Sequence, residues 1–73
     1  FDIFVEGYTS KTGSATENLG LSQLRANEVR SALMKAGIKS SRIETRGYGQ
    51  DRLRFGVADE RNERVEVVMS RPN

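Results

Sequence analysis

The sequence contains no cysteine, no histidine and no tryptophan, and only one proline among its 73 residues. Without cysteine the chain can form no disulfide, no thiolate metal site and no cysteine nucleophile. Without histidine it lacks the commonest metal ligand and general base, and it cannot build a Ser-His-Asp triad. These absences exclude most classes of enzyme and leave a single small domain that its own packing must hold together.

Long apolar runs and a strong net charge are also missing. No stretch approaches the roughly 20 apolar residues of a membrane-spanning helix. The 12 basic and 10 acidic residues leave a net charge of +2, which is too small to indicate a nucleic-acid partner by itself. Most of the basic residues lie in residues 38–73, mainly as arginine, which prefers planar anions such as carboxylates and phosphates.

Three segments show the alternation of apolar and polar residues that is typical of half-buried strands: residues 1–6, 42–46 and 65–69. A helical pattern separates the first two, and such a unit places its two strands in parallel. The third strand is expected to join the same sheet. The sequence therefore predicts an α/β fold in the order β-α-β-β, in which the helix connects two parallel strands of the sheet.

The helix is expected to begin after Ser22 as its N-cap and to end at Gly37. Gly20 argues against a longer helix, so the sequence from Ser14 to Glu17 is expected to begin only a short separate turn. The apolar stripe recurs at helical spacing and consists of Ala26, Val29, Leu33 and Ala36.

Arg25 does not suit its predicted surroundings. Behind an N-cap at Ser22 it would face the positive end of the helix dipole, which costs a cation about 0.3–1 kcal/mol. Because helix N-termini attract anions, Arg25 and the free amides would form a clamp for a carboxylate or phosphate. The alternative is a surface ion pair with Glu17 or Glu28, and the sequence leaves both interpretations open.

Two further patterns have plain structural explanations. Arginines near Tyr48 and Phe55 could form a nucleic-acid patch, but acidic residues are interleaved with them, as on an ordinary mixed-charge surface. The sequence Gly47-Tyr48-Gly49 lacks the third glycine of a dinucleotide-binding loop and is expected to end a strand. The sequence therefore predicts no nucleic-acid partner, no metal and no cofactor.

Four short blocks follow one another in the order of a known family. They are Glu6-Gly7-Tyr8-Thr9-Ser10 with Gly13, Asn18-x-x-Leu21-Ser22-x-x-Arg25-Ala26-x-x-Val29, Arg42-Ile43 leading to Gly47-Tyr48-Gly49, and Asn62-Glu63-Arg64-Val65-Glu66. Together they resemble the OmpA-like C-terminal domain of bacterial envelope proteins. The resemblance covers nearly the whole chain and implies the α/β two-layer sandwich of that family, in which a mixed sheet carries the helix on one face.

The resemblance implies a binding module and not an enzyme. The family binds peptidoglycan by gripping the ammonium and the carboxylate of the diaminopimelate in the stem peptide. The matching ligand-binding positions of this chain are Thr9, Ser10, Asn18, Arg25 and Arg64. Such a domain would anchor a periplasmic envelope protein to the cell wall, with its membrane attachment, outer or inner, in another part of the protein. The alternative is a degenerate scaffold for protein–protein assembly in a stator or secretion complex, with little affinity for peptidoglycan.

Three positions depart from the family pattern. Ser10 stands where the family has aspartate, Tyr8 where it has histidine, and Glu63 where it has arginine. The family domain also begins with a further strand and helix, so residues 1–73 are expected to be its C-terminal part. Without those elements, we expect the chain to expose the apolar side of its sheet or to pair with a second copy by strand addition or domain swapping.

Overall fold

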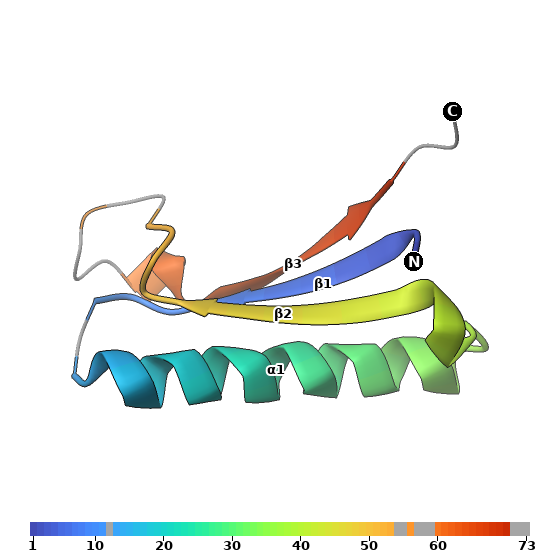
Figure 1. Cartoon of the computed structure of the whole chain (residues 1–73), viewed down its shortest axis with the longest axis horizontal. Helices are drawn as coiled ribbons and strands as arrows, with labels where there is room; N and C mark the ends of the chain where they lie inside the picture. Colours follow the sequence, from blue (N-terminus) through green and yellow to red (C-terminus); the bar gives the residue numbers. More distant parts are fainter. Residues whose placement is uncertain (12, 54–55, 57–59, 71–73) are drawn as a thin grey trace.

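One long helix packs beneath a three-stranded sheet in the computed structural model of the chain (Figure 1). The structure describes residues 1–11, 13–53, 56 and 60–70. The main elements are β1 (Ile3–Tyr8), α1 (Ala15–Lys35), β2 (Ile43–Gly49) and β3 (Arg64–Met69), and two short 3-10 helices, η1 (Ser40–Arg42) and η2 (Glu60–Asn62), precede β2 and β3. The predicted order of elements and the predicted α/β two-layer sandwich are therefore confirmed.

The sheet is mixed and has β1 at its centre. β1 runs parallel to β2 and antiparallel to β3, which gives the order β2-β1-β3. Parallel neighbours require a long crossover connection, and α1 provides it. β1 and β2 extend past their predicted ends, to Tyr8 and Gly49, and Tyr8 pairs with Arg64 of β3. The ends of β1 and β2 and the start of β3 therefore meet at one end of the sheet.

The helix begins at Ala15, earlier than the start after Ser22 that the sequence predicted. Its N-cap is Ser14, whose hydroxyl oxygen accepts a hydrogen bond of 3.3 Å from the backbone N–H of Glu17. The helix continues through Gly20, although glycine inside a helix costs about 1 kcal/mol relative to alanine. The N-cap predicted at Ser22 is wrong, because tertiary packing buries that residue completely inside α1. The C-terminal end agrees with the prediction, with Gly37 at a positive φ of 105°.

Two glycines let the helix backbone rest directly on the sheet. Gly7 and Gly47 pair across β1 and β2. A Cβ atom at Gly7 would overlap the carbonyl oxygen of Ser22, and one at Gly47 would lie 2.7 Å from the backbone nitrogen of Gln23. Because the helix and the sheet lie so close together, the hydroxyl of Ser22 can accept a hydrogen bond of 2.9 Å from the N–H of Gly49.

The core is small and lies mainly under β1 and β2. Its buried members and the half-buried side chains packed against them are Ile3, Val5, Ala26, Ile43, Val29, Leu33, Ile38 and Val65. The helix contacts β3 far less than it contacts β1 and β2. Val67 and Met69 lie opposite Val5 and Ile3 and so belong to the helix side of the sheet, yet they are 49% and 65% exposed. The helix side of β3 is thus uncovered at Val67 and Met69.

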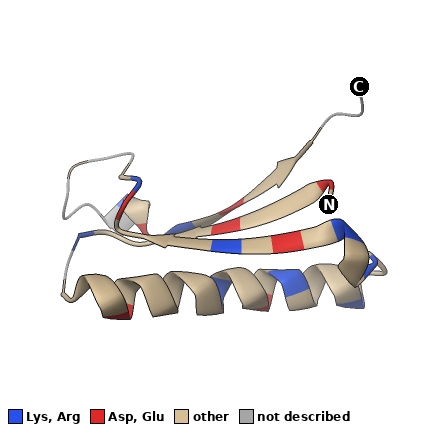
Figure 2. Ribbon diagram, in the orientation of Figure 1, with Lys and Arg blue, Asp and Glu red and all other residues tan. Residues whose placement is uncertain are grey.

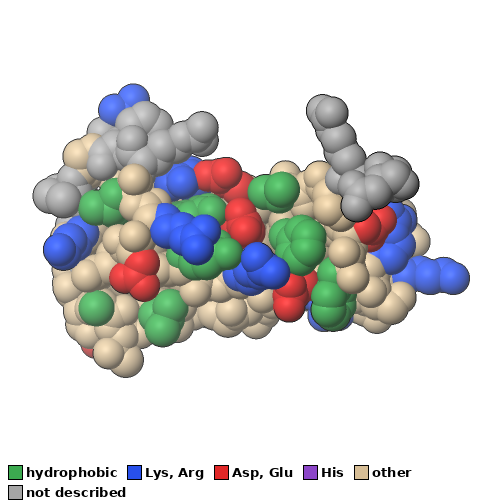
Figure 3. Space-filling model, turned by 45° about the horizontal axis from the view of Figure 1, so that its top comes forward, with side chains coloured by type: hydrophobic (Ala, Val, Ile, Leu, Met, Phe, Trp, Pro, Cys, Tyr) green, Lys and Arg blue, Asp and Glu red, His purple; other side chains and the backbone are tan. Residues whose placement is uncertain are grey.

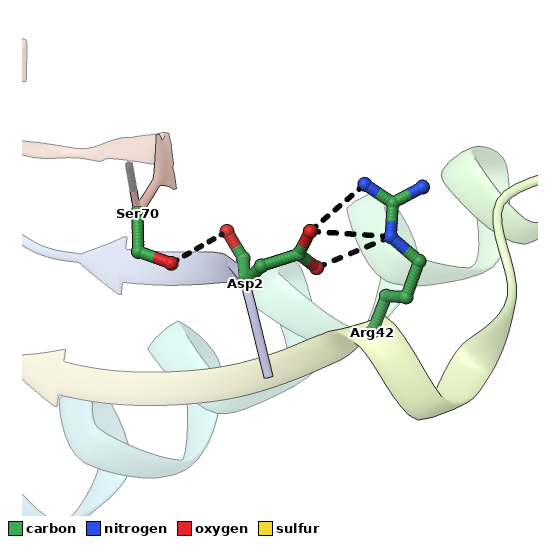
Figure 4. Close-up of polar contacts among 3 residues, drawn as sticks. All are labelled: Asp2, Arg42 and Ser70. Carbon is green, nitrogen blue, oxygen red and sulfur yellow. Dashed lines mark hydrogen bonds and ion pairs between the residues drawn. The ribbon is translucent and has the colours of Figure 1, made fainter. Parts of the chain in front are cut away.

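At the opposite end of the sheet, where β1 and β2 begin, an ion pair connects the two strands. The guanidinium of Arg42 donates to both carboxylate oxygens of Asp2, with a shortest distance of 3.0 Å, and Ser70 bonds to the Asp2 carbonyl (Figure 4). Basic and acidic residues alternate along β2 (Figure 2). No helix among the described residues is long and apolar enough to cross a bilayer.

Candidate functional site

Three of the five predicted site residues meet where β1 leads into α1. Thr9 and Ser10 follow β1 directly and are 1% and 3% exposed. Asn18 lies in the first turn of α1, and its side-chain amide donates to the carbonyl of Ser10 (3.4 Å) and to the side-chain oxygen of Gln50 (3.1 Å). The N–H of Thr9 donates to the carbonyl of Gly49 at 2.8 Å. Asn18 therefore fixes the β1–α1 loop against the residue that follows β2.

Thr9 carries an unusual hydroxyl. Its Oγ1 atom is buried and has no hydrogen-bond partner within the described ranges. A buried polar atom without a partner costs about 1–3 kcal/mol. The backbone of Thr9 is thus well held, whereas its enclosed hydroxyl has no hydrogen-bond partner among the described residues.

The other two predicted residues, Arg25 and Arg64, line one groove between α1 and β3. The groove has a volume of about 500 Å³, and its walls are formed by Arg25, Glu28, Val29, Glu63, Arg64 and Val65. Arg25 is half-buried and has neither an ion pair nor a hydrogen bond with any residue that the structure describes. The surface ion pair with Glu17 or Glu28, considered from the sequence, is therefore not formed.

The structure corrects the predicted setting of Arg25. Because α1 begins at Ala15, Arg25 lies about three turns into the helix and not in its first turn. The dipole of a helix acts within its first and last turns, so no helix-end amides assist Arg25. What makes Arg25 available to an anion is its place in the groove beside Arg64.

Arg64 is held by a stack of aromatic rings on the opposite face of the sheet. Tyr8 and Tyr48 stack with their ring centroids 5.4 Å apart. The guanidinium of Arg64 lies 4.1 Å from the Tyr8 ring centroid, and that of Arg52 lies 3.9 Å from the Tyr48 centroid. Arg64 also donates to the carboxylate of Glu66 at 2.6 Å. This Arg-Tyr-Tyr-Arg stack holds the guanidinium of Arg64 on the face of the sheet away from the helix, so Arg64 borders the groove but its charge lies on the other face.

Glu6 is hydrogen-bonded to both tyrosines of the same stack. Its carboxylate accepts hydrogen bonds from the hydroxyls of Tyr8 (3.1 Å) and Tyr48 (3.3 Å). Burial and the hydrogen bond to Glu6 raise the pKa of Tyr8 to about 12. Figure 3 shows that hydrophobic side chains are interspersed with basic and acidic ones over this part of the surface. Phe55, the other aromatic residue of the nucleic-acid patch considered from the sequence, lies outside the described residues.

The sequence analysis missed this stack. A signal was present, because the dipeptide Gly-Tyr occurs at 7–8 and again at 47–48, near the ends of two strands that were predicted to be parallel. Matching dipeptides at the ends of parallel neighbours place the two tyrosines side by side on one face. What the pattern did not reveal is that an arginine would cover the outer face of each ring.

The groove can hold both charges of a small zwitterion. Guanidinium groups bind carboxylates with paired, charge-assisted hydrogen bonds, and Arg25 supplies such a group to the groove. Glu28 and Glu63 supply carboxylates on the same walls. No cluster of acidic residues in the described part of the chain could hold a metal ion. The site is therefore built for binding charged groups.

Comparison with known proteins gives a consistent result. A family model described as "OmpA family" matches residues 1–66. The chain is 42% identical over 74 residues to the probable lipoprotein YiaD of Escherichia coli, covering 93% of this chain and 33% of that protein. It is 38% identical over 52 residues to the peptidoglycan-associated lipoprotein of Mesorhizobium japonicum, covering 71% of this chain and 31% of that protein.

A solved structure shares the fold. The crystal structure of the peptidoglycan-associated lipoprotein from Burkholderia pseudomallei matches with a TM-score of 0.80, at 28% sequence identity. The match covers 94% of this chain and 60% of that one. The chain therefore spans about a third of the length of these curated relatives and somewhat more than half of the solved domain.

Proposed function

This chain belongs to the OmpA family, and from that membership we propose that it is a non-catalytic module that binds peptidoglycan through the diaminopimelate of the stem peptide. The end of that side chain is a zwitterion with one ammonium and one carboxylate. We assign the carboxylate to the groove between α1 and β3, where Arg25 and Arg64 lie.

The observation that carries this proposal is the unpaired state of Arg25. Its guanidinium lies in a groove without a hydrogen-bond or ion-pair partner in the described part of the chain. A carboxylate there would receive charge-assisted hydrogen bonds, each contributing about 1.5–3 kcal/mol. Arg64 is held by the Tyr8 ring and by Glu66 on the other face of the sheet, so Arg25 is the guanidinium that this proposal assigns to the carboxylate.

The β1–α1 loop lies at the same end of the sheet as the groove, beside its walls and not among them. Asn18 holds the backbone of Ser10, and Thr9 offers a buried hydroxyl without a partner within the described ranges. Ser10 can exchange one neutral hydrogen bond with a ligand, but it cannot neutralise an ammonium. We therefore expect weaker binding than in relatives with aspartate at this position.

We place this module in the periplasm, where it ties an envelope protein to the cell wall. The support is the similarity to proteins named as lipoproteins and as peptidoglycan-associated lipoproteins. We further propose that residues 1–73 are the C-terminal part of a larger OmpA-like domain. The uncovered Val67 and Met69 on the helix side of β3 support this, because a strand and a helix added beside β3 would cover them; a second copy of the chain could do the same.

The second candidate function is a scaffold for protein–protein assembly in a stator or secretion complex. The observation in its favour is Ser10, which leaves the end of β1 without the negative charge that the family carries there. This candidate predicts the same fold and an empty, unused groove. It differs from the first only in its affinity for peptidoglycan, so a binding experiment separates the two.

The decisive experiment measures co-sedimentation of the chain with insoluble peptidoglycan that contains diaminopimelate. We expect binding by the wild type and at least a tenfold loss with Arg25→Ala. Arg30→Ala is the matched control, because Arg30 lies on the same helix but reaches the carbonyl of Ser40, away from the groove. Peptidoglycan that carries lysine in place of diaminopimelate lacks the carboxylate and should bind weakly. Equal binding by wild type and Arg25→Ala would refute the site, and absence of wild-type binding would favour the scaffold.

A further inference from the structure

We propose that Glu63 supplies the negative charge that binds the ammonium of the ligand, so that the groove between α1 and β3 recognises both ends of an amino-acid zwitterion. This inference rests on the proposed function and adds to it a specificity-determining residue. Position 63 is one of the three positions at which this chain departs from the family pattern, and it changes from a basic to an acidic residue.

The first argument is that Glu63 is unpaired. It lines the same groove as Arg25, and like Arg25 it has no hydrogen bond or ion pair with the part of the chain that the structure describes. By contrast, three acidic side chains in or next to the strands form ion pairs with arginines: Asp2 with Arg42 at 3.0 Å, Glu44 with Arg46 at 2.9 Å and Glu66 with Arg64 at 2.6 Å. The groove thus contains an unpaired cation and an unpaired anion on facing walls, which is the arrangement that a zwitterion requires.

The second argument is the position of Glu63 along the sheet. Glu63 directly precedes Arg64, and Arg64 pairs with Tyr8. Thr9 and Ser10 continue the chain beyond Tyr8, so Glu63 lies at the same end of the sheet as Ser10, beside the neighbouring strand. We therefore assign the charge that is missing at residue 10 to the carboxylate of Glu63, which lies just before β3 and lines the groove.

The third argument concerns direction. Val65 pairs with Gly7, the glycine that faces Ser22 of the helix, so the side chain of Val65 lies on the helix side of the sheet. Side chains two residues apart share a face, which puts Glu63 on the helix side as well, in agreement with its place in the groove wall.

Glu28 is the other acidic residue of the groove and makes a weaker candidate. It follows Arg25 by three residues on α1, toward the C-terminal end of the helix and away from Ser10. Residues three apart on a helix are neighbours. Glu28 therefore lies next to Arg25 and not next to a ligand ammonium near the end of the sheet. Because Glu28 and Glu63 share the groove, Glu28→Gln is tested beside Glu63→Gln, and Glu17, an exposed carboxyl of the same helix outside the groove walls, provides the control.

The experiment titrates two free ligands into the 73-residue chain and its variants. One ligand is meso-diaminopimelate, and the other is pimelate, which has the same two carboxylates but no ammonium. With Glu63→Gln we expect about a tenfold loss of affinity for diaminopimelate, as for the loss of one charge-assisted contact, and no loss for pimelate. With the control Glu17→Gln we expect both affinities to stay within about twofold. Circular dichroism of each variant checks that the fold is intact.

The outcomes separate this inference from the function on which it rests. Binding that depends on Arg25 but is unchanged by Glu63→Gln overturns the role of Glu63 and leaves the proposed function standing. An equal loss for diaminopimelate and pimelate also overturns it, because a charge partner of the ammonium cannot affect a ligand without one. A diaminopimelate-specific loss with Glu28→Gln transfers the role to the helix. If the wild type binds neither ligand, and Arg25→Ala changes nothing, both proposals are refuted.

Discussion

Gly7 and Gly47 are positions at which the fold leaves no room for a side chain. Each faces the backbone of α1 near Ser22, at distances that leave no room for a Cβ atom. The close approach allows the Ser22 hydroxyl to bridge the helix and the end of β2. It also sets the height of the helix above the sheet, and therefore the depth of the groove that contains Arg25.

We expect Gly47→Ala to lower the free energy of unfolding by about 1–3 kcal/mol, because the added methyl group must push the helix backbone away. Gly20→Ala is the opposite control. A Cβ atom at Gly20 meets nothing within 4 Å, so the higher helix propensity of alanine should raise the free energy of unfolding by about 0.5–1 kcal/mol. Urea denaturation of the two variants measures both effects. A Gly47→Ala protein as stable as the wild type would show that the helix is not seated as described.

Ser10 is the residue at which ligand affinity and stability are expected to oppose each other. Ser10→Asp restores a carboxylate beside the ammonium, and we expect about tenfold tighter binding of diaminopimelate, from the difference between a charge-assisted and a neutral hydrogen bond. Because Ser10 is only 3% exposed, the new charge should also lower the stability of the unliganded protein. Calorimetric titration and thermal unfolding of the same preparation measure the two quantities.

Ser10→Asp is also tested in combination with Glu63→Gln. If both carboxylates serve the same ammonium, Ser10→Asp should recover the affinity that Glu63→Gln loses. A Ser10→Asp protein that gains no affinity in either background would mean that the end of β1 does not reach the ligand.

At the scale of elements, β1 and β2 are joined at their N-terminal ends by the ion pair of Asp2 and Arg42 (Figure 4). The hydrogen bond from Arg42 holds the pKa of Asp2 below its usual value of 3.8. A carboxyl with a lowered folded-state pKa stabilises the fold above the unfolded-state pKa, and this contribution is lost as the pH falls through the folded-state value. The pairing of the two strands should therefore become acid-sensitive below about pH 4.

We expect the melting temperature of Asp2→Asn to fall less steeply than that of the wild type between about pH 5 and pH 2. Glu17→Gln is the control, because Glu17 is an exposed carboxyl outside the ion pairs of the described residues. It should keep the wild-type slope. Thermal melts at several pH values provide the measurement, and identical slopes for Asp2→Asn and the wild type would exclude a contribution from this pair.

At the scale of the whole molecule, the helix layer is narrower than the sheet layer. α1 lies mainly under β1 and β2, so β3 presents Val67 and Met69 to solvent on its helix side. β3 is also an edge strand, and an apolar edge is a template for pairing with another chain. The surface that a further strand and helix would cover is therefore the surface at which isolated copies should associate.

We expect sedimentation velocity to show concentration-dependent association of the chain, and expect Val67→Thr with Met69→Thr to reduce it, since threonine keeps a strand-forming shape with less apolar area. Leu24→Thr is a control, because Leu24 is 55% exposed on the helix and lies outside β3. A wild-type chain that stays monomeric at all concentrations and unfolds cooperatively would contradict the role of this surface.

The sequence by itself determined the order of the elements, the mixed sheet, the end of the helix at Gly37 and the family. These properties follow from short-range patterns: alternation in the strands, helical spacing of apolar residues, and glycine at a left-handed position. The start of the helix could not be read in the same way. Ser14 and Ser22 both have the chemistry of an N-cap, and the cost of Gly20 favoured the later one; packing on Gly7 and Gly47 decided for the earlier one.

Only the tertiary structure decided what Arg25 faces. The local sequence suggested a clamp at a helix end, whereas the folded chain puts Arg25 beside Arg64 and Glu63, which are distant in sequence and belong to another wall of the groove. The same holds for the stack of Tyr8 and Tyr48, which depends on the register of two strands. Local patterns report the conformation of the backbone, but the groove and the stack arise between elements, where sheet order and the height of the helix set the distances.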